Sequence, residues 1–148
     1  MSQSHTLMPA KPVFLLIEDN LIDQLVINQL LKKVLHVEEI YITNNGKEGL
    51  EWLLNNWKLH SSIIIILDVQ MPVMNGFEFL DEYAKLDIEI KKENQIYVLS
   101  STLDPDEIKQ ISDSKYVTDF LGKPFPIEEF RSKIYLNSNI SPKPDSPE

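Results

Sequence analysis

The chain has 148 residues, of which 43% are hydrophobic and 25% charged, and these values indicate one packed domain with short ends rather than a two-domain enzyme. Asp and Glu number 23 against 14 Lys and Arg, and the resulting formal net charge of -9 disfavours direct binding to nucleic acid and to anionic membrane surfaces. Cysteine is absent, which excludes disulfides and thiolate chemistry, and the longest aliphatic run, at 63–67, is far shorter than the roughly 20 residues of a spanning helix. We therefore expect a soluble, cytoplasmic protein without a membrane segment.

Both ends of the chain have the composition of unstructured segments. Residues 1–12 carry two prolines and no hydrophobic periodicity, and residues 137–148 hold three of the nine prolines. We expect a flexible arm over 1–12, one domain over 13–136, and a flexible tail over 137–148 that is too short to fold as an output domain.

Between these ends, short apolar runs alternate with segments whose hydrophobic residues recur at helical spacing. The run at 13–17 is continuously apolar and predicts a buried strand, and the β-branched run at 63–67 gives the strongest strand signal of the chain. The predicted strands are 13–17, 40–42 (at an edge), 63–67, 96–99 and 118–121. The predicted helices are 22–34, 50–57, 77–84, 108–111 and 127–134.

This alternation, five strands each followed by a helix, predicts an α/β fold with a parallel, doubly wound sheet covered by helices on both faces. In such sheets ligands bind beyond the carboxyl ends of the strands. The residues that follow each strand are therefore the first candidates for function.

Charged and hydroxyl side chains follow four of the predicted strands. Taken singly, each has an ordinary explanation: Asp19 or Asn20 could cap the first helix, and Asp104 before Pro105 could start the fourth. These separate explanations do not account for the presence of all these side chains at one edge of the sheet. The residues at this edge are Glu18 and Asp19, Asp68, Ser100 to Thr102, and Lys123.

Three carboxylates at one edge repel one another, at about 4 kcal/mol per pair for a separation of 4 Å and an effective dielectric constant near 20. One lysine and one divalent cation would bring the total charge to zero. An all-oxygen site with few protein ligands suits Mg²⁺, which is commonly shared with phosphate. The set therefore favours phosphoryl chemistry, with a carboxylate as nucleophile.

Four motifs in chain order make the sequence resemble the receiver domains of two-component response regulators, in particular the single-domain chemotaxis type. They are the acidic pair Glu18-Asp19, the run DVQMPVMNG at 68–76, Ser100 after an apolar strand, and Lys123-Pro124 after another. The resemblance covers nearly all of 13–136. It implies a flavodoxin-like (βα)5 sandwich with strand order 2-1-3-4-5.

The resemblance also assigns roles in phosphorylation. Asp68 would be the phosphoacceptor, and Ser100 would hydrogen-bond the phosphoryl group. Lys123 would pair with the phosphoryl oxygens, and its peptide bond to Pro124 is expected to be cis. Phe120, three residues before the lysine, would be the aromatic switch, although ordinary core packing would equally explain a Phe at a strand position.

For the metal, the resemblance implies Mg²⁺, with Mn²⁺ as a possible substitute. The side chains of Asp19 and Asp68 and the carbonyl of Gln70 would bind it directly, and Glu18 would act through water.

Two segments depart from the commoner pattern of these receivers. Residues 85–95 form a longer charged connection than most receivers carry, and 113–117 replaces the usual small turn before the last strand. Both lie near expected partner surfaces, so they weaken any inference about the output face.

We expect a stand-alone response regulator whose Asp68 is phosphorylated by a sensor histidine kinase or a histidine phosphotransfer protein. It would signal to an unidentified protein target, without direct contact to nucleic acid or membrane, and would have at most intrinsic autophosphorylation and autodephosphorylation activity. The alternative is an interaction module of receiver fold that phosphorylation does not regulate. An aspartyl-phosphate hydrolase fits less well, because its nucleophile follows the first strand, where this chain has Glu18 and Asp19.

Overall fold

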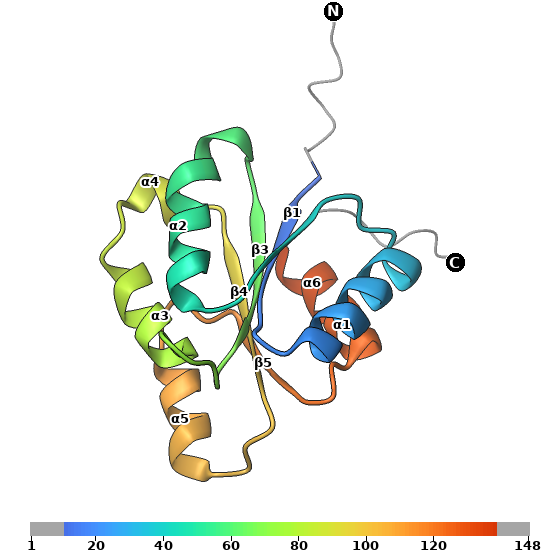
Figure 1. Ribbon diagram of the computed structural model, residues 1–148, viewed down its shortest axis with the longest axis vertical. Coiled ribbons are helices and arrows are strands. Elements are labelled where there is room, and N and C mark those ends of the chain that lie inside the picture. Colours follow the sequence, from blue (N-terminus) through green and yellow to red (C-terminus); the bar gives the residue numbers. More distant parts are fainter. Residues whose placement is uncertain (1–10, 139–148) are drawn as a thin grey trace, which may run out of the picture.

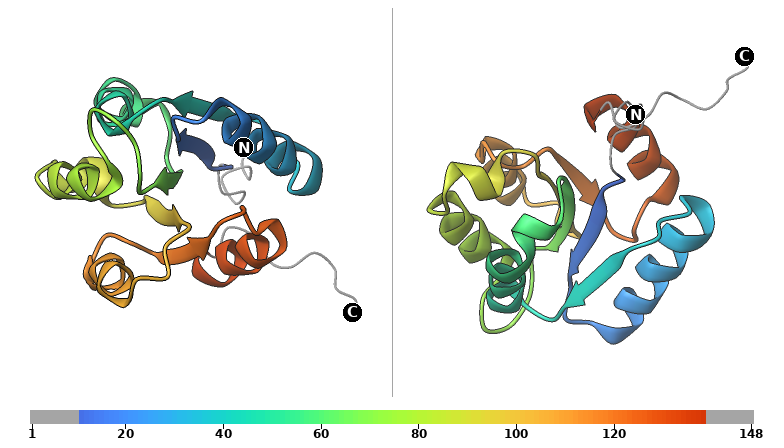
Figure 2. Two further views of the ribbon diagram at one scale, coloured as in Figure 1. Left: turned by 60° about the horizontal axis from the view of Figure 1, so that its bottom comes forward. Right: turned by 90° about the horizontal axis from the view of Figure 1, so that it is seen from above.

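The computed structural model describes residues 11–138, and five parallel strands form one sheet in the order β2-β1-β3-β4-β5. Helices cover both faces of this sheet, with α1 and α6 on one side and α2, α3, α4 and α5 on the other (Figure 1). Figure 2 shows the sheet between these two layers of helices. The predicted fold class and strand order are confirmed. The strands are β1 (Val13–Ile17), β2 (Ile40–Thr43), β3 (Ile63–Asp68), β4 (Gln95–Ser100) and β5 (Asp119–Gly122). The helices are α1 (Leu21–Val34), α2 (Gly46–Asn56), the 3₁₀ turn η2 (Trp57–Leu59), α3 (Gly76–Ala84), α4 (Ile88–Lys91), α5 (Pro105–Asp113) and α6 (Ile127–Ser138).

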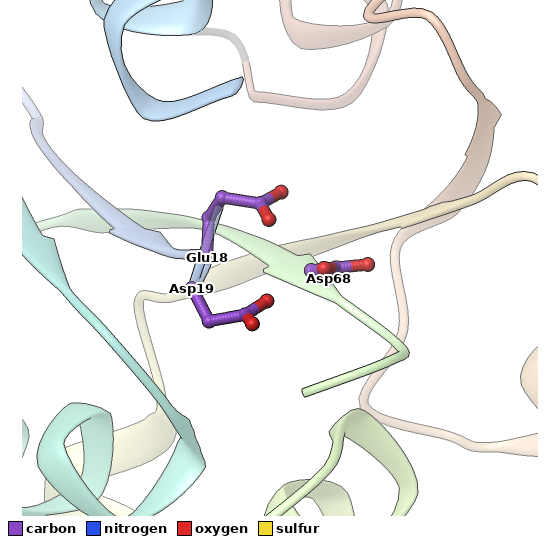
Figure 3. Close-up of side chains that lie close together, drawn as sticks. All are labelled: Glu18, Asp19 and Asp68. Atoms are coloured by element: carbon purple, nitrogen blue, oxygen red, sulfur yellow. The ribbon is translucent and has the colours of Figure 1, made fainter. Parts of the chain in front are cut away.

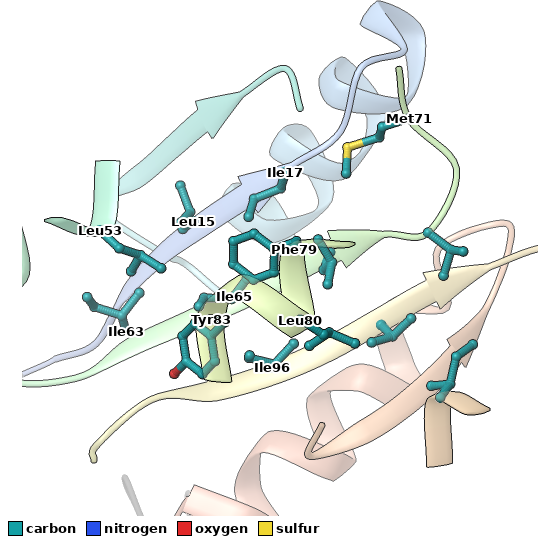
Figure 4. Close-up of a cluster of buried hydrophobic side chains, with 14 of the residues drawn as sticks. Leu15, Ile17, Leu53, Ile63, Ile65, Met71, Phe79, Leu80, Tyr83 and Ile96 are labelled. Atoms are coloured by element: carbon teal, nitrogen blue, oxygen red, sulfur yellow. The ribbon is translucent and has the colours of Figure 1, made fainter. Parts of the chain in front are cut away.

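The three central strands are buried on both faces, and alternate side chains enter two separate apolar cores. One core lies under α2, α3 and α5 and is built around the large rings of Phe79 and Tyr83 (Figure 4). The other lies under α1 and α6 and is built around Tyr97 and Phe130. In β1, for example, Leu15 belongs to the first core, and Phe14 on the opposite face belongs to the second.

Side chains at the helix starts accept backbone N–H groups that would otherwise lack partners. Asn20 accepts the N–H of Asp23 at the start of α1, as one of the predicted caps, and Asp104 with Pro105 starts α5. Asn75 forms a reciprocal capping box with Glu78 at the start of α3. The loops that follow β1, β3 and β4 are therefore each fixed by a cap.

The segment 85–95, expected as a long charged connection, contains the short helix α4, which the prediction missed. The Nζ atom of Lys91 donates to the carbonyl of Ala84 at 2.8 Å and to the hydroxyl of Tyr116 at 3.0 Å. The ring of Tyr116 packs edge-on against Tyr83, at 5.5 Å between centroids. The two segments that depart from the commoner receiver pattern therefore contact each other.

The domain limits stay predictions, because most of the expected arm and tail lies outside the described residues. The last helix runs to Ser138, two residues beyond the expected end of the domain at Leu136. Within residues 11–138, no helix combines the length and apolar character required to cross a membrane.

Candidate functional site

Strand register places the acidic side chains together. Ile17, the last residue of β1, pairs with Leu67 in β3, so Glu18, directly after β1, and Asp68, the last residue of β3, both lie at the carboxyl edge of the sheet. Ligand oxygens of Glu18, Asp19 and Asp68 all lie within 4.8 Å of one another, and Figure 3 shows the three carboxylates gathered in one space. The predicted acidic edge of the sheet is thus present as a compact cluster.

Lys123 brings a positive charge to this cluster. Its Nζ lies 3.1 Å from Oδ1 of Asp68, 4.0 Å from Oε1 of Glu18, and 3.9 Å from Oδ2 of Asp23. Burial alone would lower the pKa of Lys123, but the nearby carboxylates, Asp68 foremost, outweigh it and raise the pKa. The lysine is therefore a permanent cation here. We call Glu18, Asp19, Asp68 and Lys123 the acidic rim.

Glu18 is the least satisfied member of the acidic rim. Its Oε2 accepts the backbone N–H of Asn20 at 3.1 Å, whereas its Oε1 is buried and has no hydrogen-bond partner. Burial, followed by repulsion from Asp68, raises the pKa of Glu18 to about 8. The protein thus holds a buried carboxyl group whose charge needs a further cation.

The loop after β3 holds Asp68 in place by close backbone contact. The N–H of Gly76 donates to the carbonyl of Val69 at 2.9 Å, and a Cβ at Gly76 would lie 2.8 Å from Cα of Val69 and 2.9 Å from the carbonyl oxygen of Asp68. The N–H of Gln70 donates to Oδ1 of Asp68 at 3.3 Å. Glycine at 76 is therefore a requirement of this loop, and the metal-binding role of the Gln70 carbonyl stays a prediction.

Ser100 ends β4 at the same edge, whereas Phe120 lies two residues before the end of β5, paired with Val98. Ser100 is 3% exposed; its hydroxyl accepts the N–H of Thr102 at 3.0 Å, and its carbonyl accepts the N–H of Lys123 at 2.9 Å. Phe120 is half-buried and packs against the core under α2, α3 and α5. The Lys123–Pro124 peptide bond is cis, as expected. The switching role of Phe120 stays a prediction.

Sequence reasoning missed two neighbours of the acidic rim, both on α1. Asp23 faces Lys123, as above, and the Gln24 side chain donates through Nε2 to the Glu18 carbonyl and to Oδ1 of Asn44, at 2.8 Å in the latter case. An acid in the first turn of a helix is common for dipole reasons alone. A single sequence therefore gave no signal that separates Asp23 from an ordinary helix residue.

The acidic rim fits a hard divalent cation. Its donors are carboxylate oxygens, the ligands that Mg²⁺ prefers, and Oε1 of Glu18 is a buried oxygen without a hydrogen-bond partner. With Lys123 supplying one positive charge against three carboxylates, a cation of charge +2 would complete the neutralisation.

Comparison with known proteins agrees with this geometry. The protein-family model described as the response regulator receiver domain matches residues 14–135 of this chain. The sensor histidine kinase CheAY of Helicobacter pylori is 31% identical over 117 residues, covering 79% of this chain and 14% of that protein. The CpxR homolog of Haemophilus influenzae, a transcriptional regulatory protein, is 31% identical over 125 residues, covering 81% of this chain and 50% of the relative. This chain thus spans half or less of the length of these two relatives.

Solved structures give the same result. The crystal structure of a response regulator receiver protein from Dyadobacter fermentans superposes with a TM-score of 0.78 and 25% identity, covering 85% of this chain and 97% of that one. The family model, the fold and the acidic rim agree, and the chain belongs to the family of response regulator receiver domains.

Proposed function

We propose that this receiver domain accepts a phosphoryl group on Asp68 from a sensor histidine kinase or a histidine phosphotransfer protein, in the presence of Mg²⁺. The observation that carries the proposal is the pairing of the Asp68 carboxylate with Nζ of Lys123 at 3.1 Å, beside two further carboxylates. Asp68 is the member of the cluster that combines a direct contact with the lysine and a position at the end of the central strand β3.

The chemistry is a transfer between two protein side chains. One oxygen of Asp68 forms a bond to phosphorus while the phosphorus–nitrogen bond of a phosphohistidine breaks, and the departing imidazole keeps the electron pair and takes up a proton. Lys123 would pair with the phosphoryl oxygens as negative charge accumulates, since its Nζ already lies against the reacting carboxylate. Ser100, buried at the end of the next strand, would donate its hydroxyl to the product.

The carboxylates of Asp19 and Asp68 and the Gln70 carbonyl would hold the Mg²⁺, with Glu18 acting through water. When bound, the ion supplies positive charge against the phosphoryl oxygens and the carboxylates. Glu18 would then be ionised, because a divalent cation favours the charged form of a nearby carboxyl group. Mn²⁺ prefers the same oxygen donors.

The output would be a change in a protein-interaction surface. Hydrogen bonding of Ser100 to the phosphoryl group would draw the end of β4 inward, and the ring of Phe120 on the adjacent strand would follow. Phe120 is half-buried in β5 and packs against the core under α2, α3 and α5. The face built from α5, β5 and α6 would change as a result.

The first half of α1 carries an exposed apolar patch next to the acidic rim. A protein donor must bring its phosphohistidine into bonding distance of Asp68, so it must also cover the residues around this edge. Exposed apolar patches of this kind are typical of protein-interaction sites, and we assign this one to the kinase or phosphotransfer protein. The patch consists of Leu21, Ile22, Leu25 and Val26, which are 74%, 71%, 59% and 46% exposed.

In this account the domain is regulatory, and any turnover is its own phosphorylation and dephosphorylation. The stand-alone organisation and cytoplasmic location stay predictions, which the mass and location of the native protein in its source would test. The alternative, an interaction module that phosphorylation does not regulate, predicts that Asp68→Asn leaves binding to the target unchanged.

Intact-mass spectrometry after incubation with Mg²⁺ and acetyl phosphate, and separately with a phosphorylated histidine kinase, tests the proposal. We expect one phosphoryl group on the wild type and on the control Asp81→Asn, which removes the same charge from an exposed position on α3. We expect none on Asp68→Asn, and none on the wild type when EDTA is added first. An adduct on Asp68→Asn, or no adduct on the wild type with either donor, would overturn the proposal.

A further inference from the structure

Lys123 faces a third carboxylate that belongs to none of the strand ends. Asp23 lies in the first turn of α1, where its N–H donates to Oδ1 of Asn20 at 2.9 Å, and its Oδ2 lies 3.9 Å from Nζ of Lys123. This distance is too long for a hydrogen bond, so Asp23 acts on the lysine as a charge. It competes with Asp68 for the positive charge of Lys123.

Asp23 differs from the other two carboxylates in its exposure. The side chains of Asp68 and Glu18 are 3% and 1% exposed, whereas that of Asp23 is 45% exposed. An anion that approaches Asp68 from solvent therefore meets the charge of Asp23 near the mouth of the site. Asp23 also adds a negative charge that Lys123 and one divalent cation do not neutralise.

We propose that Asp23 is a specificity-determining residue that slows phosphorylation of Asp68 by small anionic donors through charge repulsion. This inference rests on the proposed function. A protein donor can offset the repulsion with its own cationic or hydrogen-bonding groups, whereas acetyl phosphate cannot. Asp23 thus favours phosphorylation by a protein partner over adventitious phosphorylation by metabolites.

The charge balance of the step explains the direction of the effect. When acetyl phosphate reacts, a bond forms between an Asp68 oxygen and phosphorus, the bond from phosphorus to the acetyl oxygen breaks, and acetate leaves with its electron pair. The total charge is conserved in the transfer itself: the dianionic donor brings a charge of -2, acetate carries -1 away, and the acyl phosphate on Asp68 keeps -2 where the carboxylate had -1. Repulsion from Asp23 therefore rises when the donor binds, and in the phosphorylated product it stays above its value in the free protein.

The test compares Asp23→Asn with the wild type and with Asp81→Asn, which changes the net charge equally. For a charge at a separation of about 7 Å and an effective dielectric constant of about 40 to 80, Asp23→Asn should react with acetyl phosphate about three to eight times faster than wild type at low salt. The difference should shrink in about 0.5 M salt, because the repulsion is then screened. Asp81→Asn should react at the wild-type rate.

A second measurement does not depend on turnover. The affinity for beryllium trifluoride anion, an unreactive phosphoryl mimic, can be followed by fluorine NMR in the presence of Mg²⁺. Asp23→Asn should bind the mimic about threefold more tightly at low salt. A rate and an affinity for Asp23→Asn equal to or below those of Asp81→Asn would overturn the inference while leaving the proposed function intact. Failure of the wild type to be phosphorylated at all would overturn both.

Discussion

Lys123 and Lys91 lie at opposite ends of the sheet and differ in the oxygen atoms that they contact. At the acidic rim, Lys123 lies among carboxylates that carry more negative charge than it can neutralise, and Oε1 of Glu18 has no hydrogen-bond partner. At the other end, Lys91 donates to the neutral oxygens of Ala84 and Tyr116 and lies 4.5 Å from the centroid of the Tyr116 ring. The first arrangement is incomplete without a ligand, and the second is complete.

The second arrangement, which we call the Tyr116 cluster, consists of Tyr83, Lys91, Asn94 and Tyr116. Asn94 donates to the hydroxyl of Tyr83 at 3.1 Å and to the carbonyl of Ile90 at 2.9 Å. Burial raises the pKa of Tyr83 to about 12, and the hydrogen bond from Lys91 lowers that of Tyr116. The cluster pairs its polar groups internally and fastens α4 to the segment before β5, so we assign it to stability.

The largest expected effect concerns the loop that positions Asp68. In Gly76→Ala the new Cβ would collide with the backbone of Asp68 and Val69, so this loop must shift. We expect the free energy of unfolding to fall by about 3 kcal/mol. Urea denaturation measures this change. Gly122→Ala is the matched control, because nothing lies within 4 Å of its Cβ; an equal, small loss in both variants would contradict the close packing described for the loop.

The next effect concerns the ionisation of the buried carboxyl group of Glu18. With its pKa raised from 4.5 to about 8, the folded protein retains a proton that the unfolded chain releases, so stability falls as pH rises between these values. In EDTA, between pH 6 and pH 8, the wild type should lose about 2 kcal/mol more than Glu18→Gln, whose amide cannot ionise. Urea denaturation at both pH values gives the difference.

Saturating Mg²⁺ should cancel this loss of stability, because it binds the ionised form of Glu18. Glu51→Gln, on the exposed surface of α2, provides the matched control and should keep the wild-type pH dependence. If Glu18→Gln also keeps it, the carboxyl group of Glu18 is not the source of this pH dependence.

The smallest effect belongs to the Tyr116 cluster. Tyr116→Phe removes the acceptor of a hydrogen bond from a partly exposed lysine, and we expect a loss in the free energy of unfolding that is smaller than either of the two above. Tyr41→Phe, which breaks an exposed hydrogen bond to Glu39, should cost less still. Phosphorylation by acetyl phosphate should be unchanged in both. A slower reaction in Tyr116→Phe would show that the two ends of the sheet are coupled.

The strands and the acidic rim could be predicted because they depend on patterns of neighbouring residues in the sequence. Continuous apolar runs mark strands buried on both faces, and the observed ends of β1, β3 and β4 lie within one residue of those expected. Parallel strands bring their carboxyl ends to one edge, so Glu18, Asp68, Ser100 and Lys123 could be placed together without a structure.

The missed features depend on contacts between distant residues. Helix α4 has a single turn and too few apolar residues to show a period, and it is held by Lys91, which contacts Tyr116 across 25 positions of the chain. The contact between Asp23 and Lys123 joins residues 100 positions apart (123 minus 23). Local patterns carry no information on pairings of this kind.

The contrast between the two ends of the sheet is tested most directly by titrating Mg²⁺ into the ¹⁵N-labelled protein and following the backbone amide resonances. We expect saturable changes in the resonances of residues 18–20, 68–70, 100–102 and 123, and no change in those of Lys91, Asn94 and Tyr116. In Asp68→Asn, the saturable changes should disappear. Absence of saturable binding, or changes centred on the Tyr116 cluster, would contradict the assignment of ligand binding to the acidic rim.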